Sequence, residues 1–462
     1  MSILDQDILA SIKAGERLPD LRLRISAELT RNPRTIVVLD DDPTGTQTVH
    51  GIPVITEWSQ EAIGQEMERS PIFFILTNSR ALQADKAIAL GKCIGERLRT
   101  AAQKLGKKLL VISRSDSTLR GHYPYEVDAL IEGLAWDNAK HVLAPAFFEG
   151  GRYTFRDVHY VRDGDVFIPA GKTPFAKDNT FGYKASDLKN WIIEKSEGAL
   201  GPEQISSVDI ASLRRKDLLD NAIPREGGRS HIICNATALW DLQTFAMACL
   251  EYEGNLIFRT AASFVNAISG IALRDCLDKS QMAPLDSGNG GLAVVGSYVS
   301  KTTQQLEFLK KNTNAVFIEL NVEEVLGRDS TKGYLNSLAN RIDDSVVQGS
   351  QVVLFTSRKV VAGISKAESL HIVNKVSQGI IHIIGNLQNR PQYILAKGGI
   401  TSSDVATKGL GVRRAMVLGQ IIPGVPVWRL GEETKFPGLP YIVFPGNVGD
   451  KAALHQVIRL LQ

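Results

Sequence analysis

Short β-branched runs alternate along the chain with stretches of helical character, and this alternation constrains the fold more than any other feature. The first series includes TIVVLDDD (35–42), IFFILTNSR (72–80) and KLLVISRSDS (108–117), with a helical segment at 84–106. Runs of this kind, each long enough for one buried strand, are typical of parallel sheets covered by helices. The pattern therefore predicts an α/β fold.

A second series follows a patch rich in Pro, Ser, Asp and Gly, SQMAPLDSGNGG (280–291). A chain of 462 residues is also too long for one ordinary core. We therefore predict two three-layer α/β domains with mostly parallel sheets and an inter-domain cleft. The predicted parts are an N-terminal helical extension (1–34), a first domain (35–275), a linker (276–291) and a second domain (292–462). Residues 160–205 lack clear periodicity and are expected to form an extended excursion over a site.

The composition argues against several classes of function. Apolar residues make up 44% and charged residues 22% of the chain, and the formal net charge is only +3. Basic residues are dispersed, so no nucleic-acid partner is expected. Four widely spaced cysteines without CxxC spacing indicate neither a disulfide framework nor a zinc site. With no signal-peptide pattern and no apolar stretch of about 20 residues, we expect a cytoplasmic protein without a membrane partner.

Charged side chains follow three runs of the first series, at the point where each apolar run stops. Asp40, Asp41 and Asp42 follow the first run and Arg80 the second. Because the carboxyl ends of parallel strands form the usual ligand site of an open α/β sheet, these residues are expected to converge. Guanidinium groups among them suit a carboxylate or phosphate, which favours a polar, anionic small molecule. The candidates after the third run are Arg114, Asp116, Ser117, Thr118 and Arg120.

A structural interpretation of the third segment is the alternative. Asp116 and Ser117 could cap the following helix while the arginines pair with the aspartates. In a strand, successive side chains face opposite sides, so Asp40 is expected to be the structural member of the aspartate triplet.

Three small-residue turns follow strands of the second series, in VVGSYVS (294–300), AKGGITSSDVA (396–406) and FPGNVGD (444–450). Each turn can bring backbone N–H groups close to phosphate oxygens. None matches GxxxxGK[ST] or GxGxxG, and one such turn is weak evidence. Three in one domain favour phosphate or nucleotide binding, and therefore group transfer between a nucleotide and an acid.

These ordered motifs resemble the four-carbon acid sugar kinase family over nearly the whole chain. The chain departs from the family in having Arg114 where relatives have Lys, and Asp40 as an additional aspartate. The resemblance implies an ATP-dependent kinase that phosphorylates a hydroxyl of threonate, erythronate or an oxo-tetronate, with Mg²⁺. Beside the three turns, the motifs are DDPTG (41–45), TNSR (77–80), DSTLRG (116–121), APAFFEGGRYT (144–154) and TPFAKD (173–178).

The resemblance also implies roles for individual residues. Either Asp41 or Asp42 would accept the proton of the substrate hydroxyl, while the other orients the basic rim or magnesium. Arg80, Arg114 and the segment 116–120 would line the substrate pocket. No metal ligand is assigned. ATP would be held by Ser297, Gly398, Gly399, Ile400, Thr401, Ser402, Pro445, Gly446, Asn447 and Gly449.

Two other functions stay open at this point. One is a sugar-acid sensor or effector-like protein that binds without turnover, and the other is a metal-dependent lyase or isomerase. The histidines give the second little support, because His50, His122, His141 and His159 lack HxH or HExxH spacing. The oligomeric state is open as well, a homo-oligomer included.

Overall fold

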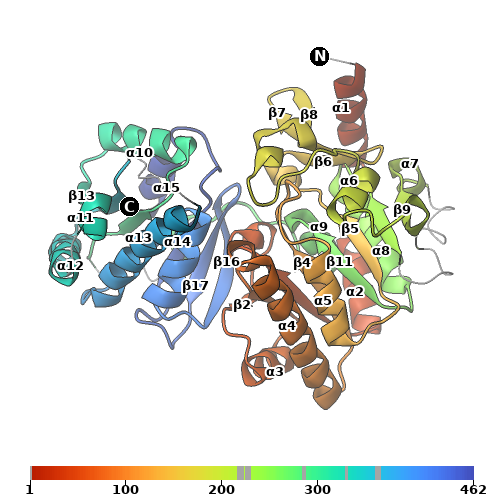
Figure 1. The fold of residues 1–462 in the computed structure, drawn as a ribbon, viewed down its shortest axis with the longest axis horizontal. Coiled ribbons are helices and arrows are strands. Elements are labelled where there is room, and N and C mark those ends of the chain that lie inside the picture. The colour runs from red at the N-terminus through yellow and green to blue at the C-terminus, as the bar shows by residue number, and fades with distance from the viewer. Residues whose placement is uncertain (1–2, 216–222, 224–229, 283–287, 328–330, 359–365) are drawn as a thin grey trace. The chain divides into compact units, whose positions relative to one another are not determined.

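The chain divides into two compact units, each of the predicted α/β class (Figure 1). The computed structural model describes residues 3–215, 223, 230–282, 288–327, 331–358 and 366–462. The first unit comprises Met1–Val49 and Glu57–Leu273, and the second comprises His50–Thr56 and Arg274–Gln462.

Among the described residues, the sheet of the first unit has seven strands, and every neighbouring pair is parallel. All six residues of β1 are buried, which requires the near-continuous apolar sequence found there. The register places Asp40 beside Leu76 on one neighbouring strand and beside Arg114 on the other. In sheet order the strands are β3 (Ile72–Leu76), β1 (Thr35–Asp40), β4 (Leu109–Arg114), β11 (Leu256–Thr260), β5 (Lys140–Ala144), β10 (His231–Cys234) and β9 (Ile205–Val208).

Helices of the first unit form two packed groups. α4 (Ala84–Leu105) contacts α3 (Gln60–Arg69) and α5 (Tyr125–Leu134), and its Gly95 lies against the backbone of α5, where a Cβ atom would come within 2.6 Å of the Leu130 carbonyl oxygen. The second group includes the predicted N-terminal helices. Its members are α1 (Ile3–Glu16), α2 (Arg22–Arg31), α8 (Leu239–Glu251) and α9 (Ala262–Ser269); the unit also contains α6 (Leu188–Lys195) and α7 (Ile210–Leu213).

A small antiparallel sheet occupies part of the region expected to be irregular. Its strands are β6 (Arg152–Phe155), β7 (Val158–Asp163) and β8 (Val166–Pro169). The turn between β6 and β7 has positive φ at both central residues, Arg156 (51°) and Asp157 (63°), as a type I′ hairpin requires. Because neither residue is glycine, the sequence gives little sign of this hairpin.

The second unit has a mixed sheet, and one of its strands comes from the N-terminal part of the chain. β2 (Pro53–Ile55) pairs antiparallel with β16, Ile55 lying beside Arg414. The sequence analysis did not predict this strand. The first five strands in sheet order are parallel and the rest antiparallel: β13 (Val316–Leu320), β14 (Val352–Thr356), β12 (Leu292–Val295), β15 (Ile394–Lys397), β18 (Pro440–Phe444), β17 (Val425–Leu430), β16 (Arg414–Ile422) and β2.

The first part of the predicted linker at 276–291 packs into the second unit instead of connecting the two units freely. Leu277 and Met282 are buried in the core of the second unit, and Leu277 N donates to the Gln420 carbonyl oxygen at 2.6 Å. Apolar side chains in an otherwise polar patch explain this packing. Residues 283–287 lie outside the described residues, and the inter-domain cleft stays a prediction. The helices of this unit are α10 (Ser300–Asn312), α11 (Val322–Gly327), α12 (Lys332–Val347), α13 (Lys366–Asn386), α14 (Gly399–Asp404) and α15 (Ala453–Leu461).

Candidate functional site

Charged side chains gather at the carboxyl ends of four neighbouring strands of the first unit. Asp40 ends β1, Arg114 ends β4, and Arg80 lies in the turn that follows β3. The structure therefore brings together the charged residues predicted for the acid site, and the Thr118 hydroxyl joins them by donating to Asp116. Ser117 takes part through its backbone carbonyl, described below. We call this group the acid–guanidinium cluster, defined as Asp40, Asp41, Asp42, Arg80, Arg114, Asp116, Arg120 and Arg259.

Arg80 lies between three carboxylates. Its Nε and Nη2 donate to the two carboxylate oxygens of Asp41 at 3.1 and 2.7 Å, which is the bidentate geometry that guanidinium groups favour. The Nη2 atom also lies 3.3 Å from Asp42 Oδ2, and Nη1 lies 3.7 Å from Asp116 Oδ1. Arg80 thus offsets the repulsion that three close carboxylates would otherwise suffer.

Asp40 lies at the buried base of the cluster. Arg114 Nη1 donates to its Oδ1 at 2.9 Å, and Gly45 packs directly against the carboxylate, where any Cβ atom would clash. Burial raises the pKa of Asp40 to about 7, helped by Asp41 and Asp42 and opposed by Arg114. A buried carboxylate paired with Arg114 fits the structural role expected for Asp40.

Asp41 and Asp42 differ in how their oxygens are occupied. Both oxygens of Asp41 accept from Arg80, and its side chain is 4% exposed. Asp42 Oδ1 accepts from the backbone N–H and hydroxyl of Thr44. Its Oδ2, among the described residues, has only the 3.3 Å approach of Arg80, and its side chain is 18% exposed. Burial raises the pKa of Asp42, but Arg80, Arg114 and Thr44 outweigh that effect and hold it below its usual value. Asp42 is therefore ionised at neutral pH.

The segment after β4 forms a closed loop around Asp116. Arg120 Nε donates to Asp116 Oδ2 at 2.9 Å, and Thr118 donates to the same oxygen through its backbone N–H at 3.2 Å and through its hydroxyl. Burial raises the pKa of Asp116, yet Arg120 and Arg80 hold it well below its usual range. The Thr118 hydroxyl therefore stabilises its own loop. This agrees in part with the structural interpretation of the segment, in which the arginines pair with the aspartates.

The same loop is held by His159, in β7 of the small sheet, and by Tyr183, further along the chain. His159 Nε2 lies 2.8 Å from the Ser117 carbonyl oxygen, and Tyr183 OH donates to the Thr118 carbonyl oxygen at 2.7 Å. Burial lowers the pKa of His159 to about 4, so its ring is neutral and Nε2–H donates to the carbonyl. His159 is thus a hydrogen-bonding residue.

Two residues of this region were missed by the sequence analysis. Arg259, in β11, is 4% exposed, and its Nη2 donates to the Arg120 carbonyl oxygen at 2.9 Å. Glu126, in α5, has its pKa raised to about 7 by burial and by Asp41, against the effects of Ser79, Arg259 and Arg80. The signal for Arg259 was its position at the end of the apolar run NLIFRT, the same signal that marked Arg80 and Arg114. Glu126 lies within a helix and does not follow an apolar strand run, so no such signal marked it.

The second unit brings its three glycine turns together around Ser297, because β12, β15 and β18 are neighbours in the sheet. Ser297 N donates to the Lys397 carbonyl oxygen at 3.2 Å. A Cβ atom at Gly398 would lie 2.8 Å from Ser297 Cβ, and one at Gly446 would lie 2.9 Å from Ser297 Oγ. Gly398 also has φ +115°, a conformation that side chains disfavour. These turns thus form a surface made of closely packed backbone.

The other predicted ATP residues lie on the same turns. Gly399, Thr401 and Ser402 belong to α14, and the Ser402 hydroxyl is turned into the fold, donating to the Ala396 carbonyl oxygen at 2.7 Å. Ile400 is exposed, at 51%. Pro445, Asn447 and Gly449 follow β18.

Two basic residues beside these turns were also missed. Lys397 is fully buried at the end of β15, and its Nζ donates to the Pro445 carbonyl oxygen at 2.6 Å. Burial lowers its pKa to about 6. Arg358, after β14, donates through Nη2 to the Ser297 carbonyl oxygen at 2.8 Å and to Thr303 Oγ1 at 2.7 Å. Both side chains hold the turns in place through carbonyl oxygens.

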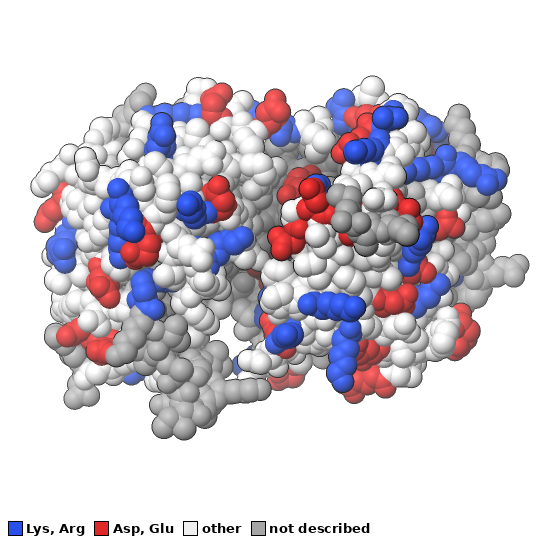
Figure 2. Space-filling view, turned by 90° about the horizontal axis from the view of Figure 1, so that it is seen from above, with Lys and Arg blue, Asp and Glu red and all other residues white. Residues whose placement is uncertain are grey.

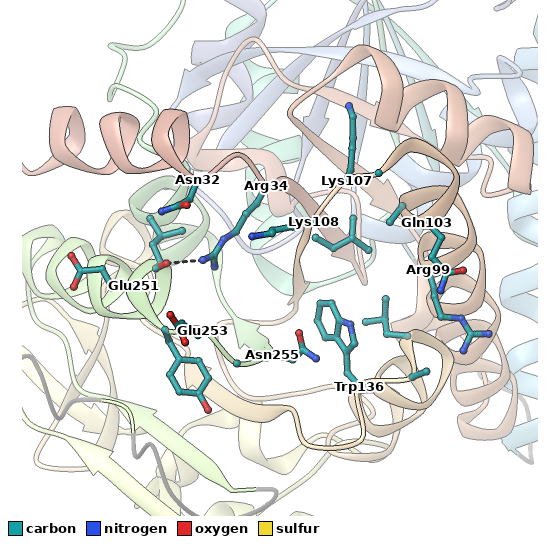
Figure 3. Close-up of a pocket in the computed structure, with 18 of the residues that line it drawn as sticks. Asn32, Arg34, Arg99, Gln103, Lys107, Lys108, Trp136, Glu251, Glu253 and Asn255 are labelled. Carbon is teal, nitrogen blue, oxygen red and sulfur yellow. Dashed lines mark hydrogen bonds between the residues drawn. The ribbon is translucent and has the colours of Figure 1, made fainter.

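A hollow of about 1060 Å³ lies at the opposite edge of the first unit's sheet, at the amino ends of β4 and β11 (Figure 3). Figure 3 places Arg34, Lys108 and Trp136 around it, and Arg34 Nη2 donates to the Leu250 carbonyl oxygen at 2.7 Å. Helices α2, α4, α5 and α8 end there, and their last carbonyl groups attract basic side chains. This hollow is separate from the acid–guanidinium cluster, and its Arg34 binds the end of α8.

Surface charges of both signs are interspersed on the face drawn in Figure 2. Within the described ranges, no set of three or more His, Cys, Asp and Glu side chains is arranged to hold a metal ion, and no helix is long and apolar enough to cross a bilayer.

Comparisons with known proteins agree with this two-part organisation. Residues 36–268 match a sugar-binding N-terminal domain, and residues 292–454 match a nucleotide-binding C-terminal domain. A D-erythronate kinase from Heliobacterium modesticaldum is 23% identical over 332 residues, covering 69% of this chain and 71% of that protein.

Two solved structures share the fold. A Haemophilus influenzae protein of the DUF1537 family has a TM-score of 0.63 and 18% identity, covering 92% of this chain and 100% of the other. A Salmonella typhimurium LT2 protein, provisionally described as a tRNA synthase, has a TM-score of 0.68 and 17% identity, covering 92% of this chain and 98% of the other. Together with the two domain matches, these likenesses show that the chain belongs to the four-carbon acid sugar kinase family.

Proposed function

We propose that the protein is an ATP-dependent kinase that phosphorylates a hydroxyl of a four-carbon sugar acid such as erythronate, threonate or an oxo-tetronate. The observation that carries the proposal is the combination, in one chain, of a sugar-binding domain containing the acid–guanidinium cluster and a nucleotide-binding domain containing three strand-end glycine turns. The D-erythronate kinase relative supports a substrate of this class. The reaction is a phosphoryl transfer, for which positioning and charge stabilisation matter most.

Asp42 is the proposed general base. Its Oδ2 is the least occupied oxygen of Asp41 and Asp42, and a base must have a free lone pair within reach of the substrate hydroxyl. Asp41, bound on both oxygens by Arg80, orients that guanidinium. Asp116 is bound by Arg120 and Thr118 and holds the loop that borders the cluster.

The nucleotide phosphates are proposed to lie against the turns around Ser297, Gly398 and Gly446. Glycines there let the three turns pack against Ser297, so that several backbone N–H groups lie close enough together to bind one phosphate group. The exposed Ile400 offers an apolar contact beside these turns. We assign no protein ligand to Mg²⁺, because Asp40, Asp41 and Asp116 are bound by guanidinium groups and Asp42 is the proposed base.

The test is ADP release from ATP in the presence of single four-carbon acids, with identification of the phosphorylated product. We expect release that depends on one acid of this class. Asp116→Asn serves as a comparison for Asp42→Asn, because it probes the other aspartate that could supply the base. Binding of an acid without ADP release would make the protein a sugar-acid binding protein, and release independent of every acid would contradict the proposal.

A further inference from the structure

Arg152 differs from the guanidinium groups that the sequence analysis chose. Arg80, Arg114 and Arg120 each form an ion pair with an aspartate of the acid–guanidinium cluster. Arg152, the first residue of β6, forms no ion pair within the part of the chain that the structure describes. Its Nη1 donates to the Gly150 carbonyl oxygen, and its buried Nε has no partner among the described residues.

The Arg152 guanidinium nevertheless lies beside the cluster. It lies 5.8 Å from the centre of the Phe175 ring, and the Arg120 guanidinium lies 5.4 Å from the centre of the same ring. Arg120 in turn binds Asp116. Arg152 therefore lies close to the loop that carries Asp116 and Arg120, which the sequence analysis assigned to the acid.

The electrostatics of Arg152 are those of a cation without its counter-ion. Burial lowers its pKa, and the nearby positive charge of Arg120 adds to this effect while Asp116 opposes it. A partly buried charge of this kind costs free energy unless an opposite charge pairs with it. An incoming carboxylate would supply that charge without displacing an aspartate.

Arg259 is the competing candidate, since it too forms no ion pair within the described residues. Its side chain is 4% exposed, and its Nη2 is bonded to the Arg120 carbonyl oxygen. Arg259 thus supports the loop through the Arg120 carbonyl and is buried. Arg152 is partly exposed, so a ligand from solvent can reach it.

We infer that Arg152 binds the carboxylate of the sugar acid and so determines the preference of the site for acids over neutral polyols. This inference rests on the proposed function. The motif GGRYT that contains Arg152 was noted only as part of the family resemblance, and no role was assigned to its arginine.

The test compares Arg152→Met with Arg152→Lys, Arg259→Met and the matched control Arg156→Met. Arg156 lies on the same hairpin, and its side chain is 70% exposed. Binding of erythronate and threonate is measured by calorimetry without ATP, and turnover is measured with each acid and with erythritol and threitol. We expect Arg152→Met to weaken acid binding about 30-fold or more, the equivalent of about 2 kcal/mol for a lost charge pair.

Further readouts separate binding from support of the fold. Arg152→Met should reduce the preference for acid over polyol by the same factor, leave the KM for ATP unchanged, and leave the ligand-free melting temperature unchanged or higher. Arg152→Lys should keep part of the preference, and Arg156→Met all of it.

Acid binding by Arg152→Met within threefold of wild type would overturn the inference, as would loss of acid binding in Arg259→Met alone. A lower melting temperature together with a raised KM for ATP would assign Arg152 a structural role and also overturn it. If wild type binds an acid through Arg152 but releases no ADP, the kinase proposal fails and this inference stands; if wild type binds no four-carbon acid, both fail.

Discussion

Replacing Arg80 with methionine should destabilise the first unit through the carboxylates that it leaves unpaired. Asp41 would lose both hydrogen bonds from Arg80, and Asp42 and Asp116 would lose a positive charge 3.3 and 3.7 Å away. Removing one partner of a buried ion pair typically costs about 3–5 kcal/mol. At roughly 2–4 °C per kcal/mol for a unit of this size, the melting temperature should fall by about 6–20 °C.

The cause can be identified with a second substitution. If the cost comes from the unpaired carboxylate, Arg80→Met should be less damaging in a chain that already carries Asp41→Asn. Arg80 lowers the pKa of Asp42 and Asp116, so its loss favours their protonation, which relieves the repulsion, and the cost should shrink as pH falls from 7 towards 4.5. Thermal denaturation of the four proteins across this pH range is the assay. Equal losses in both backgrounds, unchanged by pH, would refute the reasoning.

Three further predictions follow from the two sites. Asp42→Asn should lower kcat by about 10²–10⁴-fold and more than Asp41→Asn does, with little change in ATP affinity, and steady-state kinetics with the preferred acid would expose a reversed order. Gly398→Ala should raise the KM for ATP, because its Cβ would clash, whereas Gly411→Ala, at φ +70° with nothing within 4 Å, tests backbone strain alone. Burial raises the pKa of Glu126 in the folded protein to about 7, above the 4.5 usual for glutamate, so its stabilising effect is present below pH 4.5 and lost as pH rises through 7. Glu126→Gln should therefore gain stability over wild type across that window, by about 1–2 kcal/mol since the side chain is only partly buried; a constant difference between the two proteins would contradict this.

The sequence predicted the strands and their polar ends well, because those signals are local. A buried parallel strand needs a continuous apolar run, and Asp40, Arg80 and Arg114 each lie at or just beyond the end of one. Since parallel strands end at one edge, their convergence followed from the fold class alone. The α/β class and the family also rest on local runs and motifs, and the comparisons with known proteins confirm both.

The pairing of charges within the cluster could not be predicted, because it depends on distances that sequence spacing does not fix. Arg80 binds Asp41, 39 residues away, while Arg114 binds Asp40 across neighbouring strands. Arg152 was missed because its place beside Arg120 depends on the packing of Phe175, from a segment without periodicity. The roles of all these residues stay predictions.

The pairing of β2 with β16 has a consequence for cutting the gene into two domains. Residues His50–Thr56 belong to the second unit although the chain around them belongs to the first. A fragment that begins near residue 285 would lack β2 and would leave β16 as an open edge with unpaired backbone groups, which invites aggregation. A synthetic peptide spanning residues 50–56 could cover that edge by strand addition. The C-terminal half therefore completes its sheet only with a strand that is translated more than two hundred residues before the rest of it.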